Sequence, residues 1–197
     1  MITTEQIKEL RDATGVSVMQ CKRALEEANG DREKALMILR KKSSEISEKK
    51  ADRTLKAGLI QSYLHSTGKV GVLIELLCET DFVAKNEEFK NLAYDIAMHI
   101  AALNPEYIKR EDVSEETLAP VRELFKEEVA KIDKPEDIKE KMLQGKIDTY
   151  FKEKTLLDQP FIKNGDLTIK GLIDGAVQKI GEKIEVGRFV RYSLFEQ

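Results

Sequence analysis

The sequence contains no tryptophan, two histidines and only two cysteines, Cys21 and Cys78. A free cysteine in a reducing compartment behaves as a small apolar side chain. We therefore expect both cysteines to be buried and unpaired. No segment of the 197 residues has low complexity. This length allows one ordinary domain, or a small domain and a larger one, with enough apolar side chains for a real core.

Long apolar runs and an excess of charge of one sign are also missing. No run is long enough to span a bilayer, and the first residues, MITTEQIKEL, do not have the features of a signal peptide. We therefore expect no membrane association and a cytoplasmic location. The 33 basic and 36 acidic residues give a net charge of -3. Dedicated nucleic-acid binders usually carry a basic surplus, so we expect no direct contact with nucleic acid.

Residues 1–41 are predicted to form a domain of three short helices. Thr3 and Ser17 each precede a helical segment and are followed three residues later by glutamine, which is a capping-box signal. Gly15 ends the first helix, and Asp31 caps the third. A bundle of this size has a marginal core, so we expect it to lean on the rest of the protein or to serve as a docking module.

The second of these helices has an apolar face and a face of mixed character. Met19 and Lys22 fall outside the apolar face, which is predicted to contain Val18, Cys21, Leu25 and Ala28. Residues 42–56 follow and have almost no apolar period. We interpret them as a charged linker or a solvated helix, whose lysines are only a weak nucleic-acid signal.

Residues 57–78 are predicted to form a β-hairpin that turns at residues 66–69. Alternate residues of the second strand share one face, namely Val70, Val72, Ile74, Leu76 and Cys78. The Gly-Lys pair in the turn lacks the glycine spacing of a phosphate-binding loop, and no helix follows it. We therefore interpret it as an ordinary turn.

A helix is predicted after Asn86, which is a good N-cap residue. Its apolar residues recur at helical spacing, at Phe89, Leu92, Ala93, Ile96, Ala97 and Ile100. His99 lies at the margin of this stripe, one turn after Asp95. We interpret His99 as a hydrogen-bonded surface residue rather than as a ligand or a base.

Residues 114–153 are predicted to form an antiparallel helical hairpin, opened by Ser114 and, in its second helix, by Pro135. Pro120 lies inside the first helix and implies a late start or a bend. The apolar faces of both helices are narrow. We therefore expect part of the hairpin to stand off the body of the protein.

The chain ends with a helix between Thr168 and Gly181 and a strand that begins at Ile184. The predicted fold class is therefore α+β: an N-terminal three-helix bundle, then a core over residues 57–197 with about three antiparallel strands and packed helices. A sheet of only three strands is small, and the predicted helices cover only one of its faces. An edge or the other face of the sheet therefore stays free. The free edge or face is expected to accept a second copy of the chain.

The sequence has few groups that could perform chemistry. His65 and His99 lie on different predicted elements, and no glycine-rich nucleotide loop is present. Cys78 beside Glu79 and Asp81 is a weak metal-ligand cluster. These observations argue against an enzyme and direct attention to exposed apolar residues, which mark surfaces for partners.

Phe82 is the main candidate for an exposed apolar residue that contacts a partner. It lies in CETDFVAKNEEF, between the second strand and the helix that follows Asn86, among charged and polar residues. If Asn86 caps that helix, the staple position belongs to Lys85, so Phe82 has no staple role. From these considerations alone we expect the ring to fold back onto the end of the sheet.

Three segments of the chain resemble bacterial elongation factor Ts, the family that exchanges guanine nucleotide on elongation factor Tu. They are ELRDATGVSVMQCKRALEEANGD, CETDFVAKNEEF and IAMHIAALNPEYI, and the similarity extends over essentially the whole chain. The resemblance implies an N-terminal module similar to ubiquitin-associated domains, a core of antiparallel sheet and helices, and a protruding coiled-coil-like helix pair. It implies no cofactor and no metal.

The resemblance also implies roles for particular residues and reverses the expectation for Phe82. In the family, the corresponding ring faces outward and pushes into the nucleotide domain of elongation factor Tu, which displaces the bound magnesium. Thr80, Asp81 and Val83 are implied to hold this wedge. The further partner contacts that the resemblance implies are Val18, Met19, Lys22 and His99.

One departure from the longer members of the family concerns the core. Those members carry two hairpin-plus-helix repeats, whereas this chain has one repeat that merges the phenylalanine motif of the first with the histidine motif of the second. As in short members, a homodimer joined through the sheets is implied to restore the missing half.

Two alternatives to an exchange factor remain at this point. The first is a generic helical docking module, for example a ribosome-associated chaperone. The second is a metal enzyme that uses Cys78, His65 or His99.

Overall fold

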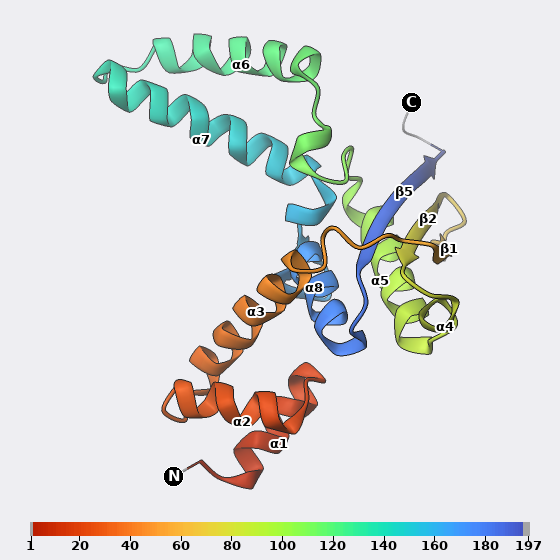
Figure 1. The fold of residues 1–197 in the computed structure, drawn as a ribbon. Helices are drawn as coiled ribbons and strands as arrows, with labels where there is room; N and C mark the ends of the chain where they lie inside the picture. The colour runs from red at the N-terminus through yellow and green to blue at the C-terminus, as the bar shows by residue number, and fades with distance from the viewer. Residues whose placement is uncertain (1, 195–197) are drawn as a thin grey trace. The chain divides into compact units, whose positions relative to one another are not determined.

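The structure, a computed structural model (Figure 1), describes residues 2–194. The chain divides into two units. The first unit consists of Met1–Ala101 and Lys170–Gln197, and the second of Ala102–Ile169. The fold is α+β, as predicted. The division into residues 1–41, 42–56 and 57–197 stays a prediction. Helix α3 (Arg32–Glu48) runs without interruption across the expected boundary after residue 41.

The three N-terminal helices begin where their capping residues predict, and the first of them also ends at the predicted glycine. Helix α1 (Thr4–Thr14) has the complete capping box of Thr3 and Gln6, and it ends at Gly15 with a left-handed φ of 68°. Helix α2 (Val18–Glu27) begins after Ser17, whose hydroxyl accepts a hydrogen bond from the Gln20 N–H. The side chain of Asp31 caps α3 in the same way.

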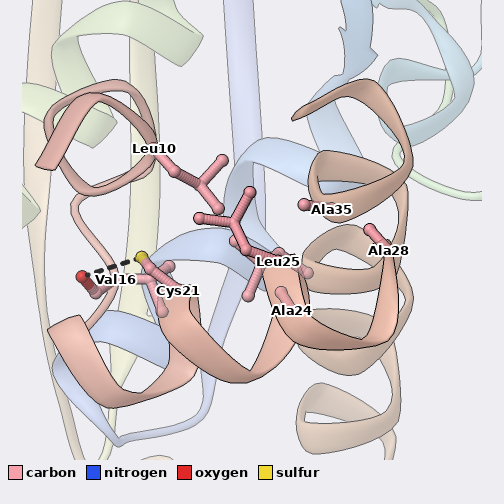
Figure 2. Packing of buried hydrophobic residues seen from close by; sticks show 8 residues of the cluster. Leu10, Val16, Cys21, Ala24, Leu25, Ala28 and Ala35 are labelled. Carbon is pink, nitrogen blue, oxygen red and sulfur yellow. Dashed lines mark hydrogen bonds between the residues drawn. The ribbon is translucent and has the colours of Figure 1, made fainter. Parts of the chain in front are cut away.

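These three helices enclose a small apolar core, and Figure 2 shows how its buried residues lie together. Cys21 is buried and unpaired, as predicted, and its thiol donates to the Val16 carbonyl at 3.6 Å. Val18 was expected on the buried face, but its side chain is 46% exposed. Val18 is the first residue of α2, beyond the packed region, and Val16 occupies the buried position next to Cys21. The buried members of the cluster are Leu10, Val16, Cys21, Ala24, Leu25, Ala28, Ala35 and Leu39.

The first unit also contains a three-stranded antiparallel sheet with the order β1-β2-β5 (Figure 1). Its strands are β1 (Ala57–Leu64), β2 (Val70–Cys78) and β5 (Ile184–Ser193). The predicted alternation in β2 is confirmed, because Val72, Ile74, Leu76 and Cys78 are buried. Helix α5 (Glu87–Leu103) packs against this inner face, where Tyr94 meets the β1 residue Tyr63 edge-to-face. Helix α8 (Ile169–Ile180) ends at Gly181, as predicted.

Gly58 in β1 lies where the sheet backbone leaves no room for a side chain. A Cβ at this position would lie 2.4 Å from the carbonyl oxygen of Leu76 in the neighbouring strand. We expect Gly58→Ala to lower the free energy of unfolding by about 1–3 kcal/mol, the usual cost of overpacking. Urea denaturation measures this change. Gly145→Ala is the matched control, because nothing surrounds a Cβ there and a helical alanine stabilises by about 0.5–1 kcal/mol relative to glycine. Equal stability of Gly58→Ala and the parent chain would contradict the expectation.

The second unit contains the two predicted helices, α6 (Glu115–Ala130) and α7 (Glu136–Lys154), packed side by side. The aromatic rings of Phe125 and Tyr150 meet across the pair at 5.8 Å. Pro120 lies within α6, so the late start considered from the sequence is wrong.

Four short elements complete this unit and were not predicted. They are the 3₁₀ turns η1 (Arg110–Asp112) and η2 (Leu156–Asp158) and the paired strands β3 (Pro160–Phe161) and β4 (Asn164–Thr168). Among residues 2–194, no helix has both the length and the apolar character that crossing a membrane requires.

Candidate functional site

The segment between β2 and α5 folds into a one-turn helix, α4 (Asp81–Ala84), which the sequence analysis did not predict. Thr80 is its N-cap, because the Thr80 hydroxyl accepts a hydrogen bond from the Val83 N–H at 3.4 Å. Asp81 occupies the first turn, where a carboxylate suits the positive end of the helix dipole. The signal was present in the sequence: threonine followed by aspartate is a common helix start.

Two neighbouring residues of α4 have opposite environments. The side chain of Val83 is only 4% exposed and anchors the turn, whereas Phe82 is 83% exposed. The expectation from local physics, that the ring folds back onto the sheet, is therefore wrong. The outward position implied by the resemblance agrees with the structure. A phenylalanine exposed to this degree contributes little to the core and is available to a partner.

The loop that leads into α4 is tied to the start of β5 and to Arg53. The Lys183 N–H donates to the Glu79 carboxylate at 2.6 Å, and the Arg53 guanidinium donates to the same carboxylate at 3.1 Å. These contacts lower the pKa of Glu79 below its ordinary value, and the hydrogen bond from the Lys183 backbone is the largest cause. The charged form of Glu79 therefore stabilises the fold.

This lowered pKa predicts a pH dependence of stability. The contribution of Glu79 is fully present above the unfolded-state pKa of about 4.3 and is lost as the pH falls through the lower folded-state pKa. We expect the stability advantage of the parent chain over Glu79→Gln to shrink as the pH falls below about 4.3. Urea denaturation of both chains at several pH values measures this. Two stability curves that stay parallel through this range would contradict the assignment.

Cys78 lies at the end of β2, just before this loop. Its thiol donates to the Thr80 carbonyl at 3.3 Å. Burial raises the pKa of the Cys78 thiol, and the nearby carboxylates of Glu182 and Asp81 raise it further. A protonated thiol is a poor metal ligand and a poor nucleophile, so Cys78 is suited to a packing role.

The other sequence-predicted contact residues lie on separate elements. Met19 is 59% exposed, and Val18 and Lys22 are exposed beside it on α2. They form one face of α2, whereas Thr80, Asp81, Phe82 and Val83 belong to the single turn of α4.

His99 is fully buried in α5, so its predicted surface location is wrong. Its neighbours Ile96, Ala97, Ile100 and Ala101 are buried too, which shows that this half of α5 is covered on more than one side. An apolar stripe marks only one side of a helix, so it does not reveal that the His99 side is covered as well. A contact between His99 and a partner stays a prediction and requires the ring to become uncovered.

The residues considered for a metal site lie apart. His65 follows β1 at the hairpin turn, whereas Cys78 lies at the opposite end of β2. Within residues 2–194, no group of three or more histidine, cysteine, aspartate or glutamate side chains is arranged to hold a metal ion.

Comparison with known proteins identifies relatives over the full length of the chain. The family model described as Elongation factor TS matches residues 7–196. A protein named Elongation factor Ts from Carboxydothermus hydrogenoformans is 52% identical over 196 residues, which covers 100% of this chain and 90% of the relative. A protein of the same name from Thermosipho melanesiensis is 46% identical over 196 residues, which covers 100% of this chain and 100% of the relative.

Proposed function

Since this chain belongs to the elongation factor Ts family, a family of translation elongation factors, we propose that it is the guanine-nucleotide exchange factor for elongation factor Tu. The observation that carries the proposal is the exposed ring of Phe82 on a short, anchored helix. In this proposal the chain performs no chemistry, needs no cofactor and acts in the cytoplasm. It binds elongation factor Tu and neither nucleic acid nor membrane.

The proposed mechanism uses Phe82 as a wedge. The ring enters the nucleotide domain of elongation factor Tu beside the magnesium and phosphate site and displaces the groups that hold the ion. Loss of the ion weakens the hold on GDP. Thr80, Asp81 and Val83 keep the turn in shape, which is supported by the Thr80 cap and the buried Val83 side chain.

The size of this effect can be bounded. Burying a phenylalanine side chain yields about 1.5–3 kcal/mol, and each tenfold change in affinity corresponds to about 1.4 kcal/mol. Phe82 alone therefore weakens nucleotide binding by about tenfold to a hundredfold. A larger acceleration needs additional binding energy from the face of α2 that carries Val18, Met19 and Lys22.

The coupling between the two ligands of elongation factor Tu is reciprocal. If the exchange factor weakens nucleotide binding by a given factor, the nucleotide weakens binding of the exchange factor by the same factor. Returning nucleotide therefore expels the chain. In this scheme the chain does not choose between GDP and GTP, and their cellular ratio decides which one rebinds.

We also propose that the chain is a homodimer joined through its sheets. One face of the sheet is covered by helices, whereas its other face exposes large apolar residues. The pairing register places them on neighbouring strands: Ile60 and Leu64 in β1, Leu73 in β2, and Val190 and Tyr192 in β5. A second copy of this face would cover these residues.

Mixing the purified chain with elongation factor Tu loaded with fluorescent GDP tests the proposed function. An exchange factor accelerates GDP release and prefers the nucleotide-free form in a pull-down. A generic docking module would bind without that preference, and elemental analysis that finds bound metal would favour the enzyme alternative. Release at the spontaneous rate would contradict the proposal.

A further inference from the structure

The loop before α4 and the loop before β5 hold each other through two carboxylates. One oxygen of Glu182 accepts hydrogen bonds from the N–H groups of Glu79 and Thr80, at 3.1 and 3.0 Å. In return, the Glu79 carboxylate accepts the Lys183 N–H at 2.6 Å. Each loop therefore supplies a carboxylate to the backbone of the other. Hydrogen bonds to a charged acceptor are about twice as strong as neutral ones.

The second oxygen of Glu182 reaches the cap of α4. It accepts the Thr80 hydroxyl proton at 2.7 Å, and the oxygen of that hydroxyl accepts the Val83 N–H at 3.4 Å. The proton of the Thr80 hydroxyl is thus committed to Glu182, which leaves the hydroxyl lone pairs facing the helix. Glu182 in this way sets the orientation of the group that starts α4.

The position of Phe82 depends on this arrangement because the ring makes little contact with its own chain. A side chain that is 83% exposed is located by its backbone, and the backbone of α4 is a single turn. A turn of this length is not stable by itself. Its order must come from its ends, where Glu182 holds the start and Val83 is buried.

We propose that Glu182 is a positioning residue for nucleotide exchange: it holds α4 in the conformation that presents Phe82 before the partner arrives. The inference rests on the proposed exchange function and adds to it a residue 102 positions from Thr80 in sequence. Binding by a pre-ordered group avoids the entropy cost of ordering it in the complex. Loss of Glu182 should therefore slow exchange without loss of the fold.

The test measures GDP release from elongation factor Tu with the full-length parent chain, Glu182→Ala and Glu182→Gln. Glu182→Ala removes the acceptor of all three hydrogen bonds, and we expect it to slow the accelerated release by at least about tenfold. Glu182→Gln keeps one acceptor oxygen for the N–H groups of Glu79 and Thr80, but it places an uncharged amide donor beside the Thr80 hydroxyl. Its release rate should therefore fall between those of the parent chain and Glu182→Ala. Glu185→Ala is the matched control, because Glu185 is an exposed glutamate of β5 that pairs with the Lys183 side chain. It should release GDP at the parent rate.

Two further readouts separate positioning from general support of the fold. In the Phe82→Ala background, Glu182→Ala should cause no additional loss, because the ring that it positions is already absent. In the free chain, Glu182→Ala should speed hydrogen exchange at the amides of Glu79, Thr80 and Val83 and leave β2 protected.

The outcomes that would overturn the proposal are distinct. Parent-like release by Glu182→Ala, an equal loss in the Phe82→Ala background, or a melting temperature far below that of the parent chain would each contradict a positioning role. If the parent chain itself does not accelerate release, the proposed function is overturned. The role of Glu182 in nucleotide exchange is then overturned as well.

Discussion

Phe82→Ala is expected to reduce the acceleration of GDP release from elongation factor Tu by about tenfold to a hundredfold. The variant removes the apolar surface that the proposed wedge brings to the partner. Because the ring is 83% exposed, its removal should leave the free energy of unfolding of the chain nearly unchanged. Release of fluorescent GDP followed in a stopped-flow instrument measures the rate, and urea denaturation measures the stability.

Phe82→Leu gives this prediction a graded control. Leucine retains part of the apolar bulk, so the rate should fall between those of the parent chain and Phe82→Ala. Release by Phe82→Ala at the parent rate would remove the wedge from the mechanism. A large fall in stability would instead show that the ring supports the fold.

Leu73→Glu is expected to convert the proposed dimer into a monomer. Leu73 lies in the central strand of the sheet, opposite Ser62 and Val190 on its two neighbours, and it is exposed in the single chain. In a sheet-to-sheet dimer each subunit would bury the new carboxylate without a partner, and the effective penalty is several kcal/mol per ion. We therefore expect the dissociation constant to rise by at least about a hundredfold.

Light scattering distinguishes the two states, because each chain has a mass of 22.4 kDa. The parent chain should show twice this mass, and Leu73→Glu should show the single-chain mass. Leu124→Glu is the matched control: it makes the same change at an exposed leucine of α6 and should stay dimeric. A parent chain that is already monomeric would refute the proposed dimer.

Much of the fold could be predicted from local patterns because each pattern is confined to one element. The alternation from Val70 to Cys78 predicts β2, and the stripe that begins at Phe89 predicts α5. The caps Thr3, Ser17 and Asp31 start the first three helices as expected. These signals need no information from distant parts of the chain.

The exposure of the Phe82 ring could not be predicted from such local patterns. Phe82 does not occupy the staple position of α5, and that local pattern does not predict the one-turn helix between Thr80 and Lys85 that holds it outward. That turn is held by Glu182, which is 102 residues away from Thr80. No local pattern in the segment around Gly181 and Glu182 marks this role. The resemblance to a family indicated an outward ring, whereas local physics indicated a buried one.

His99 illustrates a second limit. Its place at the edge of an apolar stripe predicts partial exposure, but burial depends on how many sides of the helix are covered. The burial of Ile96, Ala97, Ile100 and Ala101 shows that this half of α5 is covered on several sides. Such packing is a property of the assembled fold and leaves little trace in the spacing of one helix.

The central claim is that the chain releases GDP from elongation factor Tu by displacing magnesium with Phe82. The most direct measurement compares the GDP release rates of the parent chain and Phe82→Ala, first with magnesium and then after its chelation. The account predicts a large difference between the two chains with magnesium and little difference without it, because the ion that the ring displaces is then already gone. A difference that is equally large after chelation would contradict the claim.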